Sequence, residues 1–255
     1  MNKKLPVIIS LIVVSLIFAA FLPSPAEAQT VVPRVSLGFD ASTSPKDVAI
    51  TIQVLVLLTV LTLAPSILMM MTSFTRLVIV LHFLRQAMGM QGMPPNQVMI
   101  GLALFLTMFI MQKPAQEIYQ RAWVPYANEQ ITIQAAFAES QEPLKEFMLK
   151  QTRDKDLALF VKIADLPQPQ LKTDLPLTVI VPGYIISELR IAFQIGFLIY
   201  LPFLIIDMVV ASVLMSMGML MLPPIMISLP FKVLMFVLVD GWYLVIESLV
   251  KGIHA

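Results

Sequence analysis

Long stretches without a charged residue constrain this chain more than any other feature. No Asp, Glu, Lys or Arg occurs between Thr51 and Thr75, or between Gln86 and Gln112. A transmembrane helix needs roughly 20 predominantly apolar residues, so these stretches are long enough to contain one each. Charged residues make up 13% of the chain, whereas a soluble domain carries about 25%. The sequence therefore predicts an all-α membrane protein.

Composition excludes several classes of function. The chain has no cysteine, which rules out disulfides, thiolate zinc sites and cysteine nucleophiles. Its net charge is +1 and no basic patch with interleaved aromatic residues occurs, so a nucleic-acid partner is not expected. His82 and His254 are too far apart in sequence to suggest a metal site. We expect no catalytic residue, no cofactor and no metal, and hence no enzyme.

The first 28 residues have the features of a secretory signal peptide. Lys3 and Lys4 form a short basic segment, an apolar run from Leu5 to Leu22 follows, and Ala26-Glu-Ala28 fits the small-x-small cleavage rule. Cleavage after Ala28 would leave residues 29–46 as a loose periplasmic leader. The alternative is an uncleaved first membrane helix.

Residues 47–112 are predicted to form a first apolar helical hairpin. One helix is expected from Asp47 to Met71, with Pro65 kinking it, and another from Gln97 to Met111. The second helix would be only about 22 Å long, short for a hydrocarbon core of about 30 Å. This length favours packing against protein over a simple lipid-facing span.

More than half of the charged residues lie in residues 113–190. We predict that residues 113–186 form a small polar helical domain, with Glu142 and Pro143 at the start of a helix and an extended run from Leu177 to Val181. The following residues, 187–251, read as a second apolar hairpin, and residues 252–255 as a tail. Its arms are expected at about 187–214 and 227–251.

Charge placement predicts the orientation in the membrane. Arg76 and Arg85 have no acidic neighbours between the first two apolar segments, so the positive-inside rule places loop 76–96 in the cytoplasm. The 113–186 domain would then be periplasmic, in agreement with a signal peptide ahead of the first span. The expected location is the bacterial inner membrane.

Three ionisable residues, Asp207, Lys232 and Asp240, interrupt the second apolar hairpin and are predicted to be buried. A charge in an apolar segment normally pairs or faces water. If the turn is centred near Met219, Asp207 and Lys232 lie at the same depth and form an ion pair. A turn centred on Pro223 would instead bring Asp207 level with Asp240, and a proton relay is the alternative role. Glu188, with Arg190, is expected at a segment end, at an interface.

The turn of this hairpin contains four methionines, at positions 215, 217, 219 and 221. Methionine is unbranched and deformable, so it seals irregular gaps. A sealing role and simple apolar filling both fit the residues themselves.

Three groups of motifs resemble the FliP/SctR family, the type III export-gate proteins of flagella and virulence injectisomes. They are TSFTR (72–76) with FLRQ (83–86) and PPNQ (94–97), SELRIAFQIG (187–196) with PFLIID (202–207), and LPFK (229–232) with DGW (240–242). The resemblance implies export of unfolded flagellar subunits across the inner membrane at the flagellar basal body. It also implies a ring-like or helical pore complex of several copies side by side, with FliQ and FliR, near FlhA and FlhB.

The same resemblance implies a role for the methionines of the turn. The family is thought to close its pore with a methionine gasket, which here would comprise Met217, Met219 and Met221, the last two being the best candidates. The competing interpretation of the whole chain is a subunit of a small-solute secondary transporter or ion channel. Such transporters often contain internal repeats, and the sequence has no convincing repeat.

Overall fold

The structure is a computed structural model that describes residues 45–254, apart from 91, 168–170 and 220. The predicted signal peptide, its cleavage residues Ala26 and Ala28, and nearly all of the predicted leader lie outside the described residues. The chain divides into two compact units, residues 1–53 and 54–255. The contacts described below all belong to the second unit.

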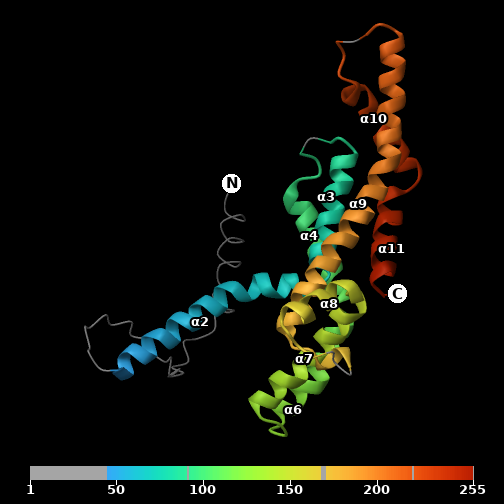
Figure 1. The fold of residues 1–255 in the computed structure, drawn as a ribbon. Coiled ribbons are helices and arrows are strands. Elements are labelled where there is room, and N and C mark those ends of the chain that lie inside the picture. Colours follow the sequence, from blue (N-terminus) through green and yellow to red (C-terminus); the bar gives the residue numbers. More distant parts are fainter. Residues whose placement is uncertain (1–44, 91, 168–170, 220, 255) are drawn as a thin grey trace, which may run out of the picture. The chain divides into compact units, whose positions relative to one another are not determined.

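Helices make up the secondary structure of the described residues, which include no strand, as expected for an all-α protein. Figure 1 shows their order along the chain. They are α2 (Pro45–Met70), α3 (Phe74–Ala87), α4 (Asn96–Ile110), α5 (Gln112–Ile118), a π-helical turn (Tyr119–Trp123), α6 (Val124–Ala127), α7 (Ile133–Gln151), α8 (Asp154–Ile163), a 3-10 turn (Lys172–Asp174), α9 (Leu177–Ser216), α10 (Pro224–Leu238) and α11 (Gly241–His254).

One described helix, α9, is long and apolar enough to cross a membrane by itself. Two further spans are possible if bent pairs of helices count as one. These pairs are α4 with Gln112–Ala127, bent by 52°, and α10 with α11, bent by 62°. Helix α4 starts and ends within one residue of its predicted bounds, and its shortness is therefore real.

The start of α9 corrects the sequence prediction. Residues Leu177 to Val181 are helical rather than extended, so α9 begins ten residues before the predicted arm and runs for 40 residues. Val179 and Ile180 are buried in a core with residues of α7 and α8. Packing of this β-branched run against other helices outweighs its strand propensity.

Helix α7 also begins earlier than predicted. Its N-cap is Thr132, whose side-chain oxygen accepts a hydrogen bond from the backbone N–H of Ala135 at 3.3 Å. Pro143 lies inside the helix and is buried, rather than in the first turn. The capping threonine is the stronger start signal, because it satisfies a backbone donor that the helix itself leaves unpaired.

The predicted second arm of the apolar hairpin is two helices, not one. It breaks between α10 and α11 at Val239 and Asp240, and Asp240 has a φ of 51°. Gly241 follows, and a Cβ atom there would lie 2.2 Å from the Phe236 ring. Glycine thus lets the two helices meet closely at the bend.

The helix α3 packs along α9 through residues buried in a shared core (Figure 1). The two helices are closely packed at Gly196, where a Cβ atom would lie 2.6 Å from Cδ2 of Phe83. The predicted cytoplasmic loop 76–96 begins with residues that the sequence also suggests are helical, 76–88, and they are helical as far as Ala87. Helices α4 and α11 also contribute to this core. Its buried residues, from all four helices, are Leu77, Val80, Leu81, Met99, Ala103, Ile110, Ala192, Leu249 and Ile253.

Candidate functional site

An ion pair links the two helices that flank the methionine turn. The Lys232 ammonium nitrogen on α10 lies 2.6 Å from Oδ2 of Asp207 on α9. Lys232 is buried, and the Asp207 side chain is 23% exposed. Helix α9 ends at Ser216 and α10 starts at Pro224, so the turn is centred near position 220. This is the first of the two predicted turn geometries, and the predicted pairing is present.

Two further groups complete this polar cluster, and the sequence interpretation missed both. The Ser228 hydroxyl donates to Oδ1 of Asp207 at 2.5 Å, and Lys232 donates to the backbone oxygen of Ala87 at 3.2 Å. Ala87 is the last residue of α3, where helix carbonyls lack an intrahelical partner. Ser228 precedes Lys232 by one helical turn, a spacing that places both on one face and was available as a signal.

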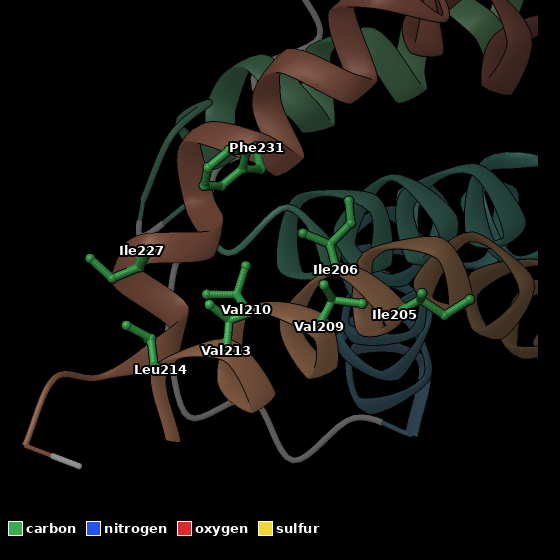
Figure 2. A pocket seen from close by; sticks show the side chains of 8 residues that line it. All are labelled: Ile205, Ile206, Val209, Val210, Val213, Leu214, Ile227 and Phe231. Atoms are coloured by element: carbon green, nitrogen blue, oxygen red, sulfur yellow. The ribbon is translucent and has the colours of Figure 1, made fainter. Parts of the chain in front are cut away.

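An apolar groove lies between α9 and α10, on the tip side of the ion pair. Figure 2 shows the side chains that line it, and all of them are aliphatic or aromatic. The groove encloses about 450 Å³. Its lining comes from Ile205, Ile206, Val209, Val210, Val213 and Leu214 of α9 and from Ile227 and Phe231 of α10. This surface is suited to an apolar chain or helix rather than to a polar solute.

The methionines of the turn are among the more exposed apolar side chains of the described residues. Met221 is 98% exposed and Met217 is 64% exposed, while Met219 is half-buried. Between them Gly218 has a φ of 74°, a conformation that glycine adopts without strain. The turn thus holds three deformable side chains at the free tip of a hairpin that the ion pair fixes below.

A second buried ion pair joins α3 to α9 and corrects one prediction. Arg76 and Glu188 are 2% and 1% exposed, and the guanidinium contacts the carboxylate through two nitrogens, with Nε 2.8 Å from Oε2. Arg76 is thus buried, and its acidic partner comes from outside segment 76–96. Glu188 lies well inside α9 rather than at a segment end. The sequence interpretation failed because the partners are far apart in the chain.

The Arg76–Glu188 pair is the centre of a larger polar cluster. Gln151, the last residue of α7, accepts a hydrogen bond from Arg76 Nη2 at 2.9 Å and donates to the Ile253 carbonyl at 2.8 Å. Arg76 Nη1 lies 3.4 Å from the Gly252 carbonyl, a longer contact. Side chains from α3, α7 and α9 thereby meet the end of α11.

A third group of charges joins α8 to α9 at Asp156. Ser187 donates to the Asp156 carboxylate at 2.7 Å, and Arg153 donates through two guanidinium nitrogens at 2.6–2.9 Å. Burial alone would favour the neutral acid, but these hydrogen bonds and the positive charge of Arg153 outweigh it. The pKa of Asp156 is consequently below its ordinary value.

Asp240 does not belong to any of these clusters. It was predicted to be buried, and the structure instead places it, exposed, at the bend between α10 and α11. Among the described residues, no three His, Asp or Glu side chains gather where they could hold a metal ion. The Asp207–Lys232 and Arg76–Glu188 pairs each join two helices.

Comparison of the sequence with known proteins identifies its family. A family model described as the FliP family matches residues 57–249. "Flagellar biosynthetic protein FliP" of Bacillus subtilis (strain 168) is 58% identical over 212 residues, which is 83% of this chain and 96% of that protein. The proteins of the same name from Pectobacterium carotovorum and Caulobacter vibrioides are 52% and 49% identical. The Pectobacterium match covers 81% of this chain and 80% of that protein. The Caulobacter match covers 94% of this chain and 88% of that protein. On these matches, the chain belongs to the FliP family.

Proposed function

We propose that this chain is a pore-forming subunit of the flagellar type III protein export gate in the bacterial inner membrane, at the flagellar basal body. Membership of the FliP family makes it a flagellar biosynthesis and export protein, and α9 is suited to a membrane. The substrates would be unfolded flagellar subunits, which pass as extended chains.

The exposed methionine turn is the observation that carries the proposal. Several copies standing side by side around an axis would bring their turns together. Met217, Met219 and Met221 would then form a gasket, because unbranched thioether side chains deform to fill an irregular opening. The Asp207–Lys232 pair serves this role structurally, by holding α9 and α10 in the register that projects the turn. Its full set of hydrogen-bond partners favours that role over a proton relay.

Exposed apolar surface supports assembly with other copies and other subunits. Helix α4 exposes Phe105, Met108 and Phe109, and α9 exposes Phe197 and Met208, among others. Apolar patches of this extent on one chain normally mark a protein or membrane interface. We assign the covering partners to further copies of this chain and to FliQ and FliR. FlhA and FlhB complete the apparatus.

The orientation follows from the sequence: residues 113–186 face the periplasm and loop 76–96 faces the cytoplasm. In the folded protein Arg85 donates to Asn96 at 2.5 Å and to the Pro94 carbonyl at 3.2 Å. Arg76 is neutralised by Glu188 in the folded protein. The positive-inside rule counts charges during insertion, so both arginines still contribute to it.

Co-purification tests this function against the transporter interpretation. Full-length chain carrying an affinity tag, extracted in a mild detergent with its operon neighbours expressed, should elute as one complex of several copies with FliQ and FliR. The same tag on a variant lacking Met217–Met221 should still capture both, because the turn is a tip and not the proposed contact surface. A small homo-oligomer free of FliQ and FliR would contradict the proposal and support a solute transporter.

A further inference from the structure

The last turn of α11 is held by side chains from other helices. The final four carbonyls of any helix lack intrahelical partners. Here Gln151 donates to the Ile253 carbonyl at 2.8 Å, and Arg76 approaches the Gly252 carbonyl at 3.4 Å. Both side chains are fixed in turn, because Arg76 pairs with Glu188 and also donates to Gln151. The end of α11 thus has a ready-made polar receptor.

The other end of α11 is a bend. Val239 and Asp240 interrupt the helical course from α10, the two helices differ in direction by 62°, and Asp240 is in the left-handed region. A segment joined to its neighbour through such a break has few backbone hydrogen bonds to hold its direction. The direction of α11 is set instead by contacts along its length, chiefly those of Leu249 and Ile253 in the core with α3, α4 and α9.

Aromatic contacts connect α11 with the residues beside the Asp207–Lys232 pair. Trp242 on α11 stacks edge-on against Phe236 of α10 at 5.4 Å between ring centres, and Phe236 lies 6.2 Å from Phe203 of α9. Phe236 follows Lys232 by one helical turn, on the same helix face. Movement of α11 would therefore disturb the packing beside the Asp207–Lys232 pair.

We propose that α11 is a hinged arm, latched at its end by Arg76 and Gln151, and that Gln151 is the positioning residue through which the polar domain holds the arm against α9. Opening of the latch swings α11 about the bend at 239–240 and loosens the α9–α10 hairpin. The inference deepens the proposed function, since a looser hairpin gives a looser methionine turn. Its test measures local protection of a side chain and does not depend on export.

Single cysteines report such an opening, because the chain has none of its own. Leu249→Cys probes the buried face of α11, and Leu157→Cys probes a second core, which α8 forms with α7 and α9 and which includes no residue of α11. Ser248→Cys, at the exposed position next to Leu249, gives the labelling rate of an unprotected cysteine. Each is placed in full-length chain within the purified complex, and labelling by a membrane-permeant maleimide is timed in the parent, Gln151→Glu and Gln134→Glu backgrounds.

Gln151→Glu keeps a side-chain oxygen that accepts a hydrogen bond from Arg76. It removes the side-chain N–H that donates to the Ile253 carbonyl. Loss of one hydrogen bond corresponds to up to roughly a tenfold shift in a local equilibrium. The proposal predicts labelling of Leu249→Cys about tenfold faster in Gln151→Glu, with Leu157→Cys unchanged. Gln134→Glu, the same charge change at an exposed position of α7, should alter neither.

Two results would overturn the latch. Equal acceleration at Leu249→Cys and Leu157→Cys would mean that Gln151 stabilises the fold as a whole and does not hold an arm. Unchanged protection at Leu249→Cys in both Gln151→Glu and Gln151→Met would mean that α11 needs no polar receptor. If the arm opens as predicted and the methionine turn nevertheless proves dispensable, the latch stands and the gasket fails.

Discussion

Lys232 and Asp207 lie 2.6 Å apart on two helices that the methionine turn separates. Each has a further partner, since Ser228 donates to Asp207 and Lys232 donates to the last carbonyl of α3. This cluster ties three helices together just below the exposed turn. The position of the turn therefore depends on polar contacts in an otherwise apolar hairpin.

Removal of one partner of this pair should be costly. Lys232→Met keeps most of the volume but leaves the Asp207 carboxylate without its cation, which commonly costs about 3–5 kcal/mol at a buried pair. We expect loss of the assembled complex, measured by size-exclusion chromatography and by thermal unfolding. The double variant Asp207→Asn with Lys232→Met removes both charges and should recover part of the assembly.

The exposed pair Lys251–Glu247, at 2.7 Å, provides the control. Exposed pairs contribute little to stability because water and salt screen them, so Lys251→Met should assemble normally. A harmless Lys232→Met, or a double variant no better than that single one, would contradict the pairing.

Close packing at Gly196 predicts a steric effect. A Cβ atom there would fall 2.6 Å from the Phe83 ring and 3.0 Å from its Cβ atom. Overpacking of this kind costs about 1–3 kcal/mol, so Gly196→Ala should lower the midpoint of thermal unfolding. Gly101→Ala is the matched control, because no atom lies within 4 Å of a Cβ at that helical position. If both changes shift the midpoint of thermal unfolding equally, α3 can move away from α9 enough to accommodate the added methyl group.

Asp156 predicts a dependence of stability on pH. Its pKa is lowered in the folded protein, so the ionised form contributes stability that is present above the unfolded pKa of about 3.9. This contribution is lost as pH falls through the lower pKa of the folded state. Asp156→Asn should therefore destabilise the protein at pH 7 and progressively less below about pH 4, measured by thermal unfolding.

Asp240→Asn is the control for this pH series. Asp240 is exposed at the bend, and asparagine tolerates the left-handed conformation found there. The change should have little effect at any pH in the range. If the difference in unfolding temperature between the parent and Asp156→Asn stays constant down to pH 3, the carboxylate contributes no charge-dependent stability.

The proposed orientation predicts opposite labelling of two exposed positions. Lys155→Cys lies in the 113–186 domain, and Gln86→Cys lies near the end of α3. An impermeant thiol reagent should label Lys155→Cys in spheroplasts and Gln86→Cys in inverted vesicles. The reverse pattern would invert the topology.

Much of the fold was predictable from the local sequence. The apolar periodic segments predicted the helices, and α4 was located within one residue, because an apolar run between charged or proline-rich flanks determines its own bounds. The pairing of Asp207 with Lys232 followed from their equal distance from a turn marked by Gly218 and Pro223. In both cases the determining residues lie close together in the chain or symmetrically about a turn.

The missed features depend on contacts between distant residues. Arg76 and Glu188 are separated by more than 100 positions, and Gln151 and the end of α11 likewise meet only through the tertiary fold. The bend at Asp240 needs a left-handed aspartate followed by a glycine under the Phe236 ring. Local hydropathy contains no signal for such contacts, since one-dimensional patterns do not specify which faces of helices meet.

The account centres on the methionine turn as the seal of a pore. Its most direct test is ion permeability of vesicles that contain the complex, with Met219→Ala and Met221→Ala combined. If the turn seals the pore, the variant complex should keep its composition and leak small ions at a rate well above that of the parent. Met208→Ala with Met226→Ala, at exposed positions outside the turn, should not leak. A turn variant that assembles fully and stays as tight as the parent would contradict the claim.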